Sequence, residues 1–266
     1  MSMFFGFEHI TVAYGKHTVL NDVTLEVPQG RICVLIGRNG CGKSSLLRTV
    51  SRAVKPKSGR VIWQDRPLDE YSPRQRARGI AYLGQSVSSP ADIDVETLVS
   101  YGRYPHMSAG RGMTAHDRKV IDHALMKAGL DAIRNRALNT LSGGELQRAR
   151  IAMNLAQEPS ILILDEPTTH LDIGYQLEIM ELLRKLNREL GLTVLMVLHD
   201  VDLAARYADR ICGICDGRLD VAGTPEGVIT VENMRRLFGI ESEILWDETN
   251  GCPYVRPRTY TNEENE

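Results

Sequence analysis

The chain has no apolar run long enough to cross a membrane as a helix. Its longest wholly apolar stretches are short, such as Ile161 to Leu164 and Val194 to Leu198, whereas a spanning helix needs about 20 apolar residues. The start, MSMFFGFEHITV, has no cationic segment ahead of a long apolar run, so it does not resemble a signal peptide. We therefore expect the protein to stay in the cytosol without entering the membrane.

The sequence also lacks an excess of either charge. Lys and Arg total 32 against 34 Asp and Glu, which gives a formal net charge of -2 at pH 7. This balance provides no general electrostatic attraction to nucleic acid, and binding to DNA or RNA would require a local basic patch instead. We expect no nucleic-acid partner.

Cysteines are few, and their number is odd. The five are Cys33, Cys41, Cys212, Cys215 and Cys252. Their scattered positions favour reduced thiols over a disulfide framework. Cys212 and Cys215 have CxxC spacing but lie in an apolar run, and no second pair of Cys or His residues is nearby to complete a metal site. We expect this pair to lie in a buried strand, with a redox or metal site as the alternative.

The length and the local patterns predict an α/β fold. With 266 residues and 42% apolar content, the chain lies near the upper end of what one α/β domain holds. Short β-type runs bounded by turn residues occupy the first part. They are Phe7 to Tyr14, Val23 to Val27, Ile32 to Ile36, Arg60 to Trp63 and Ile80 to Leu83. Helical periodicity then prevails from Asp94 to about Pro159, which indicates an inserted helical subdomain.

The later part of the chain predicts a parallel sheet. Ile161 to Leu164 and Thr193 to Leu198 resemble buried strands, and an amphipathic helix ended by Gly191 lies between them. A strand, helix and strand with this crossover length form a βαβ unit, which builds a parallel sheet. We expect one domain over residues 1–266. Its parts are a core of about 1–85 and 160–240, a helical subdomain of about 86–159 and a less regular tail of about 241–266, ending in a solvated TNEENE.

A phosphate-binding loop follows the strand Ile32 to Ile36. Residues 37–44 read GRNGCGKS, which fits G-x-x-x-x-G-K-[ST] between a buried strand and a helix. Its glycines let successive N–H groups point at phosphate oxygens, and the helix adds its positive N-terminal end. Lys43 is expected to reach the β- and γ-phosphates, and the Ser44 hydroxyl to bind Mg²⁺. The candidate nucleotide-binding residues here are Gly37, Arg38, Asn39, Gly40, Cys41, Gly42, Lys43, Ser44 and Ser45.

Two carboxylates come directly after the buried run Ile161 to Leu164. Asp165 is expected to hold Mg²⁺, and Glu166 to polarise the attacking water as a general base. Taken alone, adjacent carboxylates could equally mark an exit from a strand to a loop. The phosphate loop upstream favours the catalytic interpretation.

A second candidate anion site lies at LSGGE, from Leu141 to Glu145. Ser142 is a candidate N-cap, and the glycines expose the first N–H groups of a helix that has no phosphate loop of its own. Together with the phosphate loop and the carboxylates, these residues resemble the ATP-binding cassette (ABC) ATPase family, over nearly the whole chain. The resemblance implies a P-loop NTPase core with a mostly parallel sheet, an N-terminal antiparallel β portion and an inserted α-helical subdomain.

In that family two cassettes meet head to tail, so that the signature of one subunit closes over the nucleotide of the other. Here the resemblance assigns that signature to Ser142, Gly143, Gly144 and Glu145. Glu145 stands where many cassettes have Gln, and Ser45 where many have Thr. Neither departure removes a catalytic group.

The same resemblance assigns four further residues, each with an ordinary structural alternative. Tyr14 resembles the aromatic that stacks on adenine, although a Tyr ending a strand often only packs. Gln85 resembles the glutamine that senses Mg²⁺ and the attacking water, and alone it would be polar surface. Asp172, in THLD, resembles the carboxylate that couples the two sites of the dimer. His199 matches the histidine that contacts the γ-phosphate, and alone it would be a polar cap.

Several loop strings resemble one branch of the family, the ATPases for uptake of ferric siderophores, haem and vitamin B12. They are GRYPH at 102–106, LDEPTTHLDI at 164–173, VLHDVDLAARYAD at 197–209, LFGIE and CPYVRP. The resemblance implies an ATPase that uses Mg²⁺ with ATP and powers an importer, with ferric siderophores as the nearest cargo class. The implied partners are a second copy, an integral membrane permease and indirectly an external substrate-binding protein. The permease is expected to dock on the segment from Gln85 through the inserted helices, including Arg103 to His106. The implied location is the cytoplasmic face of the inner membrane, as a peripheral protein.

Other functions remain as alternatives. The cargo could be haem or vitamin B12, or the chain could be a soluble ABC ATPase not tied to transport. An exporter subunit and a non-enzymatic scaffold are disfavoured, the first by the siderophore-like loops and the second because Lys43, Asp165, Glu166 and His199 are all present.

Overall fold

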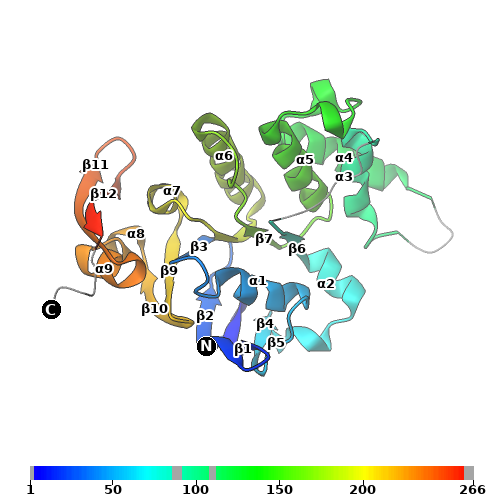
Figure 1. Ribbon diagram of the computed structural model, residues 1–266. Coiled ribbons are helices and arrows are strands. Elements are labelled where there is room, and N and C mark those ends of the chain that lie inside the picture. Colours follow the sequence, from blue (N-terminus) through cyan, green and yellow to red (C-terminus); the bar gives the residue numbers. More distant parts are fainter. Residues whose placement is uncertain (1–2, 86–91, 108–111, 261–266) are drawn as a thin grey trace. The chain divides into compact units, whose positions relative to one another are not determined.

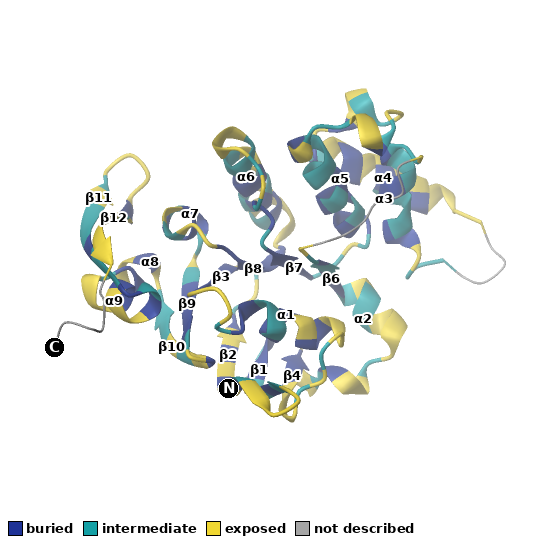
Figure 2. Cartoon of the chain, in the orientation of Figure 1, coloured by how far each residue is buried: buried dark blue, intermediate teal, exposed yellow. Residues whose placement is uncertain are grey.

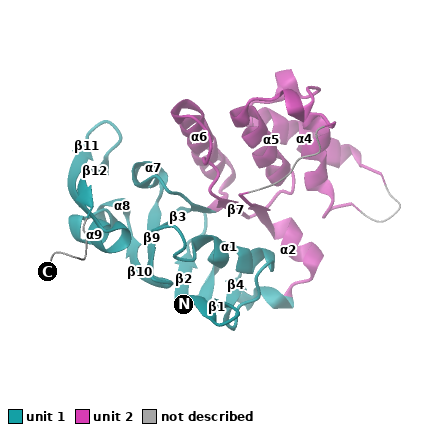
Figure 3. Cartoon of the chain, viewed as in Figure 1, with its two compact units in different colours: residues 1–70, 195–266 teal, residues 71–194 magenta. Residues whose placement is uncertain are grey.

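A computed structural model describes residues 3–85, 92–107 and 112–260 of the chain (Figure 1). They fall into two compact units, residues 1–70 with 195–266, and residues 71–194 (Figure 3). Both units combine strands and helices, which confirms the α/β class. The predicted solvated end, TNEENE, lies outside the described residues.

The first unit contains the predicted antiparallel β portion. β1 lies between β2 and β4, and β5 extends the sheet beyond β4. In β2 the side chains of Leu20, Val23 and Leu25 are buried while most polar neighbours are exposed, as expected when one sheet face packs on the core. The strands are β1 (Phe5–Tyr14), β2 (His17–Val27), β4 (Ser58–Trp63) and β5 (Arg66–Pro67).

A second sheet of this unit carries the phosphate loop. β3 (Ile32–Ile36) is buried at every residue and runs parallel to β9 (Arg210–Cys215), which pairs antiparallel with β10 (Arg218–Gly223) (Figure 2). The continuous apolar run of β3 explains its burial on both faces. Cys212 lies inside β9, and burial raises the pKa of its thiol to about 11. The prediction of a buried strand at the CxxC pair is confirmed.

The C-terminal part differs from the prediction of a less regular tail. After α9, residues 240–260 form an antiparallel hairpin of β11 and β12, with β11 packed on α9 and β12 on α7. The expectation was wrong because this hairpin lacks a regular apolar alternation and is held partly by charge pairs, such as Arg235 with Glu241 and Arg258 with Glu243. The elements are α1 (Lys43–Ser51), η1 (Leu68–Glu70), α7 (Val201–Tyr207), α8 (Pro225–Val228), α9 (Val231–Phe238), β11 (Ile240–Asp247) and β12 (Cys252–Tyr260).

The second unit contains the predicted helical subdomain and two parallel strands. β6 (Ile80–Leu83) pairs in parallel with β7 (Ile161–Asp165), and β8 (Thr193–Val197) begins here before it enters the first unit. The helices are α2 (Pro73–Gly79), α3 (Val95–Ser100), η2 (Tyr101–Arg103), α4 (Ala115–Lys127), η3 (Asp131–Ile133), η4 (Leu138–Thr140), α5 (Gly143–Leu155) and α6 (Ile173–Leu190).

The ends of α6 follow its sequence. Asp172 accepts a hydrogen bond from the Tyr175 N–H at 3.0 Å, and Gly191 ends the helix in a left-handed conformation with φ 64°. Ile179 and Leu183 are buried on one face. The amphipathic helix predicted between two buried strands is therefore confirmed.

Candidate functional site

The phosphate loop joins the end of β3 to the start of α1. Gly37 and Gly42 have φ values of 141° and 106°, which favour glycine. Both also lie against neighbouring segments, since an added Cβ would lie 2.2 Å from the Ile214 carbonyl oxygen at Gly37 and 2.4 Å from the Leu20 side chain at Gly42. The loop is thus fixed by close packing, with its N–H groups at the N-terminus of α1.

Lys43 is held inside the curve of this loop. Only 5% of its surface is exposed, and its Nζ donates hydrogen bonds to the carbonyl oxygens of Gly37 at 2.7 Å and Arg38 at 2.9 Å. The Cys41 Sγ lies 3.7 Å from the same nitrogen. A cation is therefore fixed where the loop amides gather, which suits an anionic ligand.

Tyr14 lies beside this loop. Its hydroxyl is 3.2 Å from the Ser45 Oγ, which places the end of β1 next to the first turn of α1. The ring is 48% exposed. A half-exposed aromatic beside a phosphate loop can stack on a base, as the sequence predicts for Tyr14.

The catalytic carboxylate predicted from sequence lies in the second unit. Glu166 follows the wholly buried β7 and has φ 55°, an uncommon conformation for a non-glycine residue. Its Oε2 accepts hydrogen bonds from Gln85 Nε2 at 2.7 Å and from Thr169 Oγ1 at 3.1 Å. Gln85 and Glu166, which lie far apart in the sequence, are thus brought together. Thr169 belongs to the THLD segment that the resemblance assigns to coupling, but its contact with Glu166 was not predicted, because it depends on the turn after Glu166.

The signature segment begins α5 as a capping box. Ser142 Oγ accepts the Glu145 N–H at 3.2 Å, while a carboxylate oxygen of Glu145 accepts the Ser142 N–H at 2.8 Å. The hydrogen bond from the Ser142 backbone, together with Arg136, lowers the pKa of Glu145. At Gly144 an added Cβ would lie 2.3 Å from the Tyr175 ring, so α5 approaches α6 closely there.

The remaining predicted residues lie at the ends of helices and strands. Asp172 caps α6, and Gln147 on α5 donates to the Pro167 carbonyl oxygen at 2.8 Å, which ties α5 to the segment after Glu166. His199 follows β8, where the Leu198 N–H donates to the Leu35 carbonyl oxygen at 3.2 Å. The first unit therefore holds Tyr14, the phosphate loop and His199. The second holds Gln85, the signature segment, Asp165, Glu166 and Asp172.

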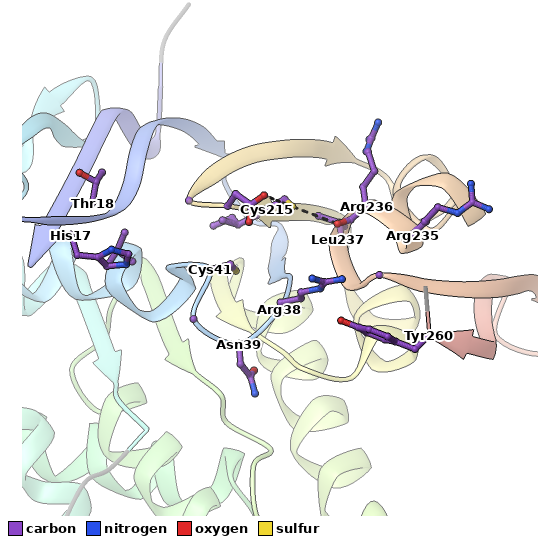
Figure 4. Close-up of a pocket in the computed structure, with 16 residues that line it drawn as sticks. His17, Thr18, Arg38, Asn39, Cys41, Cys215, Arg235, Arg236, Leu237 and Tyr260 are labelled. Atoms are coloured by element: carbon purple, nitrogen blue, oxygen red, sulfur yellow. Dashed lines mark hydrogen bonds between the residues drawn. The ribbon is translucent and has the colours of Figure 1, made fainter. Parts of the chain in front are cut away.

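A cavity of about 990 Å³ borders the phosphate loop within the first unit (Figure 4). Arg38 extends from the loop toward Tyr260, with its guanidinium carbon 5.8 Å from the ring centroid. Arg235 and Arg236, on another wall, pair with carboxylates of Glu241 and Asp220. Of the arginines that line this cavity, Arg38 therefore faces an aromatic ring, whereas Arg235 and Arg236 each pair with an acid. Tyr260 could not be predicted as part of this cavity, because it lies far from the loop along the chain.

The residues assigned to Mg²⁺ lie in both units, Ser44 in the first and Gln85 and Asp165 in the second, and each offers an oxygen atom. Hydroxyl, amide and carboxylate oxygens are the ligands that Mg²⁺ prefers, and Asp165 is only 2% exposed at the end of β7. In the described part of the chain, no cluster of three or more His, Cys, Asp or Glu side chains is arranged to bind a metal. Each of these side chains thus offers a donor of the kind that Mg²⁺ accepts.

Within residues 3–85, 92–107 and 112–260, no helix has the length and apolar character needed to span a membrane.

Comparisons with known proteins point to one family. A family model described as ABC transporter matches residues 20–169. The ferric enterobactin transport ATP-binding protein of Escherichia coli (strain K12) is 42% identical over 250 residues, which cover 94% of this chain and 92% of that protein. The hemin import ATP-binding protein of Rhodopseudomonas palustris (strain BisB18) is 39% identical over 266 residues, covering 97% and 96%. A dimeric bacterial ABC transporter cassette of known structure has a TM-score of 0.71 at 30% identity, covering 83% of this chain and 98% of that one.

Proposed function

This chain belongs to the ABC transporter family, and we propose that it is the ATPase subunit of an importer for ferric siderophores. It hydrolyses ATP to ADP and phosphate, and this reaction powers transport. One observation carries the catalytic part: Glu166 ends a buried strand with its carboxylate held by Gln85 at 2.7 Å. The cargo class is supported by the similarity to the ferric enterobactin protein.

In the proposed mechanism, Glu166 polarises the attacking water as a general base. Hydrogen bonds from Gln85 and Thr169 hold its carboxylate in one orientation, and a fixed base transfers a proton more efficiently than a mobile one. His199 contacts the γ-phosphate. Gln85 orients this base through its amide N–H groups, and its amide oxygen would be free to help hold Mg²⁺.

In this proposal, the first unit binds the nucleotide. The loop N–H groups, the N-terminus of α1 and Lys43 neutralise the phosphates, and Tyr14 stacks on the adenine. Ser44, Gln85 and Asp165 would hold Mg²⁺ through their oxygens. When bound, Mg²⁺ neutralises charge that develops on the phosphate oxygens.

Two copies of the chain are proposed to bind ATP head to tail. The capped start of α5 at Ser142 presents helix N–H groups, an arrangement that suits an anion supplied by another subunit. Asp172 would couple the two sites. The dimeric cassette of 30% identity supports this arrangement.

The permease is proposed to dock on the segment from Tyr101 to Met107. Buried Arg103 and half-buried His106 attach this segment to the end of α5, through the carbonyl oxygens of Ala156 at 2.7 Å and Gln157 at 2.8 Å. Tyr104 is 62% exposed on this rigid support. Rigid exposed aromatics are common anchors of interfaces. The chain would therefore lie at the cytoplasmic face of the inner membrane, peripherally, below a permease that receives cargo from an external binding protein.

A second cargo has its own support. The hemin import relative matches nearly the whole chain, so haem is the alternative cargo, with vitamin B12 as a third member of the same branch. A soluble ABC ATPase outside transport is the remaining alternative.

The proposal is tested by uptake of labelled ferric siderophore, haem and cobalamin. Cells whose only copy carries Glu166→Gln are compared with cells that carry the native chain, in a background without redundant importers. We expect selective loss of ferric siderophore uptake, because the variant cannot activate water. Loss of haem or cobalamin uptake alone would reassign the cargo. Normal entry of all three would remove the importer assignment and leave the ATPase.

A further inference from the structure

A second cavity, of about 350 Å³, lies entirely within the unit of residues 71–194. None of its lining residues belongs to the candidate ATP site. Its floor is apolar, with Ala124, Leu155 and Leu192 at 1%, 8% and 3% exposure. Small-molecule sites have volumes of about 300–1,000 Å³, apolar walls and a few polar groups. The cavity fits that description.

The polar groups gather at one side of the cavity. His116, Lys119 and His123 come from α4, at positions i, i+3 and i+7, so they lie along one helix face. The one carboxylate of the lining, Glu158, is already engaged. Its Oε2 accepts a hydrogen bond from Arg103 Nη1 at 2.7 Å and lies 3.7 Å from His116 Nε2.

Lys119 is the remaining charged side chain of the cavity lining. It forms no ion pair or hydrogen bond with any other residue that the structure describes. Its side chain is exposed at the edge of the apolar hollow, so its ammonium is available to a ligand that lies there. A single carboxylate matches this one available cation.

We propose that this cavity binds a small amphiphile with a single carboxylate headgroup and a short alkyl chain. The alkyl chain lies on the floor formed by Leu155, Leu192 and Ala124, and the carboxylate pairs with Lys119. This ligand site is independent of the ATPase assignment, because it shares no residue with it.

Calorimetric titration of the full chain with octanoate, below its micelle concentration, tests the proposal. Octanol, which has the same chain length without charge, is the comparison ligand. We expect octanoate to saturate at one molecule per chain and octanol to bind more weakly. Lys119→Ala should weaken octanoate binding about fivefold, the upper range for a pair at a protein surface, and leave octanol binding unchanged.

Two further variants complete the design. Lys55→Ala removes another exposed lysine, in the first unit, and should leave octanoate binding unchanged. Leu190→Ser, at the 41% exposed edge of the cavity, should weaken both ligands. The proposal is overturned if octanoate does not saturate, if octanol binds as tightly, or if Lys119→Ala and Lys55→Ala behave alike. Thermal melts of each variant establish that the variants are folded.

Discussion

Arg103 shows how one buried charge can organise the helical part of the molecule. It is 1% exposed and donates to Asp117 at 2.9 Å, to the Ala156 carbonyl oxygen at 2.7 Å and to Glu158 at 2.7 Å. Taking a guanidinium out of water is costly, and close partners on three sides offset that cost. The side chain therefore joins η2, α4 and the end of α5.

Arg103→Met is expected to lower the free energy of unfolding by about 3–5 kcal/mol, because Asp117 would be buried without its cation.

Hydrogen bonds from Thr114, with Arg103, lower the pKa of Asp117 to about 2. Because this pKa is lower in the folded chain, the carboxylate stabilises the fold at any pH above its unfolded pKa of about 3.9. The contribution is lost as the pH falls toward about 2. Urea unfolding at pH 7 and at lower pH measures both effects. A loss below about 1 kcal/mol at pH 7 would contradict this account.

At the scale of elements, three of the described helices begin with a capping box, and in two of them the cap is a serine. Ser142 on α5 and Ser72 on α2 are both caps of capping boxes, with Glu145 and Gln75 as their partners. Replacing either serine by alanine should cost about 1 kcal/mol of stability. Only Ser142 is placed in the ATP site, so the two variants separate capping from catalysis.

Ser142→Ala should therefore reduce ATPase turnover about tenfold or more, since a hydrogen bond to a charged group is worth about 1.5–3 kcal/mol. Ser72→Ala should keep native turnover at a similar loss of stability. Chemical denaturation and steady-state ATPase assays on both variants make the comparison. Equal turnover in the two variants would remove Ser142 from the site and leave it as a cap alone.

Whether an element could be predicted from the sequence depends on how local its pattern is. β3 and β7 are continuous apolar runs, and the glycines after β3 are required by local backbone geometry, so these elements and Lys43 were predictable from short segments. The hairpin of β11 and β12 was not, because its pairing is antiparallel between segments with irregular patterns. The contacts of Tyr260 with Arg38 and of Thr169 with Glu166 depend on packing and turn geometry that no local pattern encodes.

At the scale of the whole molecule, the residues proposed to bind ATP and those proposed to hydrolyse it come from different units of the chain. The loop with Lys43 belongs to residues 1–70 and 195–266, and Glu166 and Ser142 belong to residues 71–194. In the proposed cycle, ATP bridges two copies of the chain until its γ-phosphate is removed. Binding and hydrolysis are then separable steps, because binding favours the assembly and hydrolysis reverses it.

Glu166→Gln should separate them, because it keeps every phosphate contact but lacks the base. With Mg²⁺ and ATP this variant should accumulate as a dimer that retains one ATP per chain, whereas the native chain should return to monomers after hydrolysis. Lys43→Ala is the matched control, since it removes a phosphate contact and should stay monomeric. Analytical ultracentrifugation with quantification of bound nucleotide measures all three proteins. A Glu166→Gln protein that turns over ATP normally would show that another group is the base. One that holds ATP as a monomer would show that the signature of a second copy is not needed for tight binding, because the capped start of α5 would then contribute nothing to the nucleotide.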